Sequence, residues 1–151
     1  MSPMQTAYIR IVRKIKSKSD GETAIAKDIV KDGIGKMLGR FSQEPGIIEA
    51  SRKLYATAIK TYKTPTSMIA DAAKEGANLL FEKFGTAACG EILLIFSSAI
   101  AQYFQLEGET LAKPLAEEAS TFFKKVGCEG QATKVIEILD DPRTKSEFKM
   151  F

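Results

Sequence analysis

The sequence predicts an all-α protein, a compact bundle of about six to eight helices arranged as stacked helical hairpins. Apolar residues recur at the spacing of helical turns along most of the chain, and strand-like alternation is nearly absent. Glycine, proline and capping residues interrupt this pattern at short intervals. The 151 residues fit one domain, and 44% hydrophobic with 27% charged residues is ordinary for a globular protein.

The first segment, residues 1–18, is predicted to form a basic amphipathic helix or arm attached to a single helical domain over residues 19–151. Its apolar side chains share one helical stripe: Tyr8, Ile11, Val12 and Ile15. Its five cations are Arg10, Arg13, Lys14, Lys16 and Lys18. The segment has no acidic residue, so the net charge of +3 for the whole chain originates here.

Caps and breaks place the next two helices. Ser19 and Glu22 have the spacing of a capping box and precede a predicted helix over residues 23–41. Pro45 stands near the start of the following helix, which we expect to extend to about residue 62.

The middle of the chain holds the most apolar helix. Thr64 is expected to cap a helix over residues 65–84, and Gly85 is a natural left-handed stop. Residues 87–104 then form a helix that is apolar on every side, which is typical of a central helix surrounded by its neighbours. Polar residues interrupt this stretch, so we expect it to fall short of a membrane-spanning helix.

Three further elements complete the predicted bundle. Pro114 is expected in the first turn of a helix that ends at Gly127. A shorter helix carries Val135 and Leu139, and a final short piece follows Asp141.

Similar segments recur with a period near 42 residues. They are residues 31–41, 74–84 and 116–126, with a second set at 58–62 and 99–103. A period of this length suits a repeated two-helix hairpin. The alternative is an ordinary bundle whose regular loops and amphipathic helices produce the same echoes.

Histidine is absent, which excludes serine–histidine and cysteine–histidine mechanisms and removes the commonest metal ligand. The carboxylates recur in lysine-bearing helices, where ion pairs on a solvated face are the ordinary explanation. We therefore expect no enzyme activity, no metal site and no cofactor.

Cys89 and Cys128 form no CxxC motif and do not resemble a disulfide framework. We expect a buried free thiol at Cys89 and a loop thiol at Cys128. Both favour an intracellular, reducing compartment, the cytoplasm first and a mitochondrial location as the alternative.

Two other features suggest contacts. Gly35 and Gly39 lie four apart on one helical face and are expected to allow close helix packing or partner contact. Phe148 and Phe151 place large apolar groups at the chain end, where they would dock into their own core or into a neighbouring subunit.

The function predicted from these features is a non-enzymatic interaction or assembly subunit that forms homo- or hetero-oligomers. The main alternative is a nucleic-acid-binding module that contacts phosphates through the basic segment. An anionic membrane surface would suit the same segment. A second alternative is a carrier of a hydrophobic ligand, lined by Phe81, Phe84, Phe96, Phe104, Phe122 and Phe123.

Overall fold

The computed structural model describes residues 1–17, 23–63 and 65–141, with the backbone alone for residues 23–29. Its α-helices are α1 (Pro3–Ser17), α2 (Thr23–Phe41), α3 (Ile47–Thr61), α4 (Ser67–Phe84), α5 (Cys89–Glu107), α6 (Glu109–Lys125) and α7 (Glu129–Glu137). Two short 3₁₀ helices, η1 (Gly85–Ala88) and η2 (Ile138–Asp140), follow α4 and α7. These residues form no strand, and the all-α prediction is confirmed.

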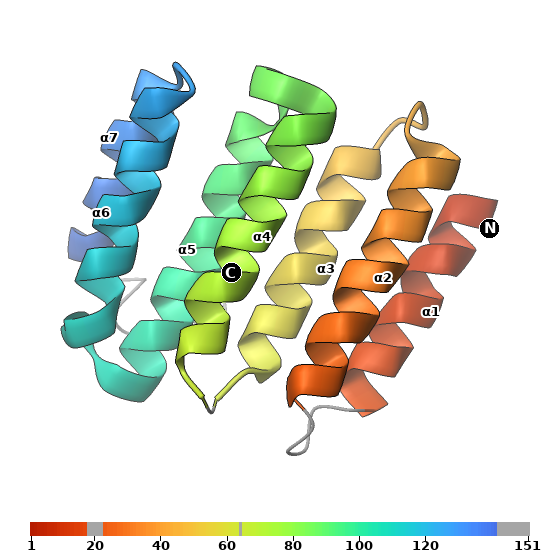
Figure 1. Ribbon diagram of the computed structural model, residues 1–151, viewed down its shortest axis with the longest axis horizontal. Coiled ribbons are helices and arrows are strands. Elements are labelled where there is room, and N and C mark those ends of the chain that lie inside the picture. The colour runs from red at the N-terminus through yellow and green to blue at the C-terminus, as the bar shows by residue number, and fades with distance from the viewer. Residues whose placement is uncertain (18–22, 64, 142–151) are drawn as a thin grey trace.

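The helices stand side by side as an array of antiparallel hairpins (Figure 1). The array begins with α1 and α2, continues through α3, α4 and α5, and ends with α6 and α7, with α7 behind α6 in this view. Helix α3 packs on α1, α2, α4 and α5 and so joins the two halves. One continuous hydrophobic core extends from Ile11 in α1 to Leu139 in η2.

Helix α1 confirms the predicted amphipathic helix, and it is packed on α2 and α3 rather than extended as a free arm. Ile11 and Ile15 are buried on its inner side. Its start is a capping box that the sequence analysis missed: the Ser2 N–H donates to Gln5 Oε1 (2.9 Å), and the Gln5 N–H donates to Ser2 Oγ (3.1 Å). The predicted box at Ser19 and Glu22 lies outside the described residues.

Helix α5 is the central helix, as its apolar composition predicted. It packs on α3, α4, α6 and α7, and every residue from Ile95 to Tyr103 is buried. The run Ser67–Glu107, which comprises α4, η1 and α5, contains a stretch long and apolar enough to cross a membrane by length and composition alone, contrary to the expectation for residues 87–104. Because 56% of that apolar window is buried inside the bundle, core packing also accounts for its composition.

The glycines that permit close helix packing are not the predicted pair. Gly35 and Gly39 are exposed, and a Cβ built on either would meet nothing within 4 Å. Neither glycine therefore allows close packing between the described helices, and their role in partner contact stays a prediction. A Cβ on Gly76 would instead lie 3.0 Å from the Tyr55 ring, and one on Gly33 would lie 3.1 Å from the Ile11 side chain. Two glycines spaced four residues apart share one face of a helix, but their spacing does not show whether that face meets another helix.

Cys89 and Cys128 are joined by a disulfide bond, which corrects the expectation of two free thiols. Cys89 begins α5, and Cys128 is the residue before α7. The bond ties α5 to the turn between α6 and α7, across a sequence separation of 39 residues. Disulfides persist mainly in oxidising compartments. The expectation of a reducing compartment rested on two free thiols and therefore loses that support.

Pro114 lies inside α6, five residues after its start, and not in the first turn as expected. The similar segments lie at corresponding places in the fold. The first set forms, to within one residue, the C-terminal parts of α2, α4 and α6, at residues 31–41, 74–84 and 116–126. The second set, residues 58–62 and 99–103, lies at the end of α3 and in the second half of α5. These positions fit both a repeated hairpin and an ordinary bundle with regular loops, so the repeat stays a prediction.

Candidate interaction groove

A groove between α1 and α2 is the main candidate site. It has a volume of about 350 Å³ and is lined by residues from both helices. Four cations line it: Arg10 and Lys14 from α1, and Lys36 and Arg40 from α2. Apolar side chains lie between them, including Ile11, Met37 and Phe41.

Helical spacing explains why these cations meet. Arg10 and Lys14 are four residues apart, so they share one face of α1. Lys36 and Arg40 have the same spacing and share one face of α2. Burial of Ile11 and Met37 between the two helices then turns both cationic pairs toward the rim of one groove.

Two local contacts hold the α2 cations. Lys36 Nζ lies 3.1 Å from Asp32 Oδ2, and both side chains are largely exposed, so this ion pair is weak and easily exchanged. The Arg40 guanidinium lies 4.9 Å from the centre of the Phe41 ring, in a cation–π contact. Asp32 is the single acidic residue among those that line the groove in the described structure.

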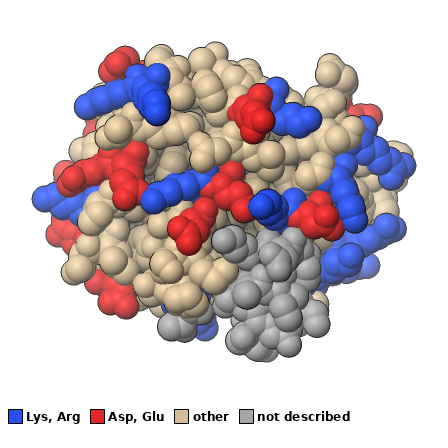
Figure 2. Space-filling view, in the orientation of Figure 1, with Lys and Arg blue, Asp and Glu red and all other residues tan. Residues whose placement is uncertain are grey.

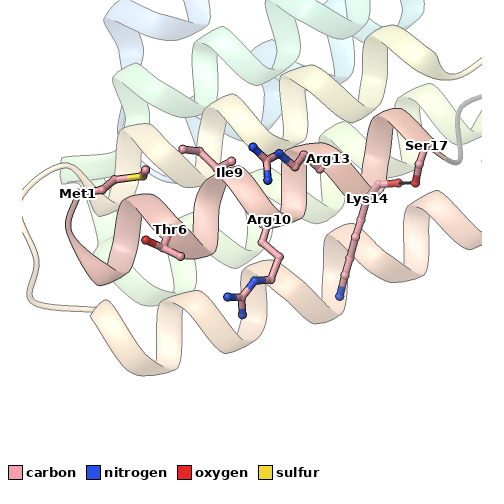
Figure 3. A pocket seen from close by; sticks show the side chains of 7 residues that line it. All are labelled: Met1, Thr6, Ile9, Arg10, Arg13, Lys14 and Ser17. Carbon is pink, nitrogen blue, oxygen red and sulfur yellow. Dashed lines mark hydrogen bonds between the residues drawn. The ribbon is translucent and has the colours of Figure 1, made fainter.

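A second hollow lies along the outer side of α1 and shares Arg10 and Lys14 with the groove (Figure 3). In this view Arg10 and Lys14 extend toward α2, whereas Arg13 projects from the opposite side of α1 with Ile9. Thr6 and Ser17 also line the hollow, but their hydroxyls donate to the backbone carbonyls of Ser2 and Lys14, respectively.

The structure divides the predicted cations. Arg10 and Lys14 line the groove, Arg13 lines the outer hollow, and Lys16 is exposed but lines neither. Lys18, Phe148 and Phe151 lie outside the residues that the structure describes. Lys36 and Arg40 were missed, although their spacing of four residues in a predicted helix was visible in the sequence.

Charge separates along the array. On the face shown in Figure 2, Lys and Arg gather at the end formed by α1 and α2, and acidic side chains are more frequent toward α6 and α7. Residues 129–141, which include α7 and η2, carry four acids and one lysine. The free side of this segment presents Thr133, Ile136, Glu137 and Asp140, all exposed.

Charged side chains between neighbouring helices have structural partners. Arg52 Nε donates to Glu91 Oε1 (2.8 Å) and joins α3 to α5, and Lys74 pairs with Glu118 (2.7 Å) to join α4 to α6. The hydrogen bond to Glu118 raises the pKa of Lys74. These carboxylates therefore hold helices together, and no cluster of three or more metal-ligating groups occurs in the part of the chain that is described.

Four of the six phenylalanines considered for a ligand pocket pack on one another. Phe122 contacts the rings of Phe81, Phe96 and Phe123, with centroids 5.5 to 6.1 Å apart. Phe96 and Phe123 also meet edge to face, at 5.8 Å. Such mutual contacts are those of a packed core, so the carrier hypothesis gains no support from this cluster.

Comparison of the chain with protein-family models, with curated proteins and with solved structures finds no match.

Proposed function

We propose that this protein is a non-enzymatic interaction subunit that binds an acidic protein surface through the groove between α1 and α2. The observation that carries the proposal is the arrangement of Arg10, Lys14, Lys36 and Arg40 around an apolar floor. A groove of this kind suits a helix or strand that carries both carboxylates and an apolar side chain.

The apolar floor favours a protein partner over a nucleic-acid backbone. A phosphate backbone is recognised mainly through its charge, so the apolar atoms that line the groove, largely buried as they are, would add nothing to its binding. A protein segment with one apolar and two acidic side chains would satisfy the cations and cover the floor together.

A binding assay with two probes of equal charge tests the proposal. Fluorescence anisotropy would compare a labelled acidic amphipathic peptide with a labelled single-stranded oligonucleotide. We expect the peptide to bind and the variant R10E/R40E to lose that binding, because the reversal places carboxylates at both groove walls.

The control variant K83E/K113E carries the same change of charge on exposed positions of α4 and α6. It should bind the peptide as the wild type does. Tight, salt-sensitive binding of the oligonucleotide with no binding of the peptide would overturn the proposal and favour the nucleic-acid alternative.

A further inference from the structure

We propose that the acidic partner is a second copy of this chain, whose α7 docks into the groove between α1 and α2, so that copies associate head to tail. This inference rests on the proposed function of the groove. It adds the identity of the partner and names the surface that the partner contributes.

The free face of α7 and η2 has the chemistry that the groove requires. Thr133, Ile136, Glu137 and Asp140 follow the spacing i, i+3, i+4, i+7, so they form one helical stripe. Ile136 is one of the few large apolar side chains exposed in the described structure, with an exposed fraction of 37%. Glu137 and Asp140 follow it on the same stripe, so its apolar surface adjoins two carboxylates, as the apolar lining of the groove adjoins its cations.

The opposite signs of the two ends are the second argument. Solubility requires charged outer faces at both ends of a helical array, but it does not require that they differ in sign. Helices α1 and α2 carry eight cations and two acids, whereas residues 129–141 carry one cation and four acids. An end-to-end contact between copies would bring these unlike charges together.

The location of the surfaces sets the form of the assembly. The groove lies at one end of the array and α7 at the other, so a chain cannot fill its own groove with its own α7 (Figure 1). A contact between two different surfaces is heterologous, and unless its rotation closes a ring it produces open chains. Self-association should therefore increase steadily with protein concentration.

Sedimentation velocity over a range of concentrations, at low and at high salt, tests this inference. We expect the wild type to form larger species at low salt and a monomer at high salt, because the contacting charges are exposed and easily screened. The variants R10E/R40E and E137K/D140K should each weaken self-association by about tenfold or more, since each reverses one surface only.

Mixing the two variants gives the decisive measurement. The acidic groove of R10E/R40E matches the basic α7 of E137K/D140K. In the same mixture, the native α7 of R10E/R40E matches the native groove of E137K/D140K. The mixture should therefore form large species although neither variant does so alone. The control K83E/K113E should associate like the wild type.

Each outcome has a distinct meaning. A wild type that stays monomeric at every concentration, or a mixture of variants that fails to associate, overturns the head-to-tail contact. If the acidic peptide still binds the groove in that case, the proposed function stands with a different partner. If the peptide also fails to bind, both proposals fail.

Discussion

Helices α2 and α5 have the same length, 19 residues, but they meet very different surroundings. Helix α5 packs on four helices and contains two charged residues, whereas α2 packs on α1 and α3 and contains six. The number of neighbours sets how much of a helix must be apolar. A helix at the end of an array keeps one free face, and that face can hold the residues that recognise a partner.

The largest effect should come from the disulfide that anchors α5. Replacing both Cys89 and Cys128 with Ala should lower the free energy of unfolding by about 4 kcal/mol, because the unfolded chain regains the freedom of a loop of 39 residues. Urea denaturation measures the change. Reductant should destabilise the wild type and leave the double variant unaffected. A double variant as stable as the wild type would show that packing alone anchors α5.

A smaller effect should follow from filling the close contact beside α5. Gly76→Val should lower the free energy of unfolding by about 3 kcal/mol, because its Cβ would meet the buried Tyr55 ring and Ile95. Gly90→Val is the matched control, since a Cβ there meets nothing within 4 Å. Thermal unfolding would compare the two, and equal melting temperatures would contradict this description of the core.

Alkaline pH should weaken the same region. Burial, and then the nearby Glu75 carboxylate, raise the pKa of Tyr55. The unfolded chain therefore loses the phenol proton near pH 10 while the folded chain retains it, and stability falls by up to about 1.4 kcal/mol per pH unit above that value. Urea denaturation from pH 8 to about 11 checks this. Tyr55→Phe should have a flatter profile, and an unchanged slope would exclude Tyr55 as the cause.

The smallest effect, opposite in sign, is expected on the free face of α2. Gly35→Ala should raise the free energy of unfolding by about 0.5 to 1 kcal/mol, because alanine favours the helix and its Cβ meets nothing within 4 Å. Thermal unfolding again measures the change. A loss of stability would mean that this face already has a contact in the folded chain.

Much of the fold was predictable because local signals and helical periodicity agree. Ile11 and Ile15 lie on the predicted stripe, and the apolar composition of α5 correctly placed it at the centre. The start of α6 was misplaced because Pro114 is tolerated within the helix and does not mark its first turn. Only the α1 side of the groove was predicted. Arg10 and Lys14 belong to a segment without acidic residues, whereas Lys36 and Arg40 belong to a helix of mixed charge and gave no such signal.

Local sequence patterns were enough to predict that the chain is helical, which faces of its helices are apolar, and that the excess positive charge lies in residues 1–18. These properties depend on residues within a few turns of one another. The tertiary structure decided that α1 and α2 form one cationic groove, that Gly76 rather than Gly35 allows close packing, and that Cys89 meets Cys128. Each depends on residues about 20 to 40 positions apart, and only the stacking of hairpins brings such residues together.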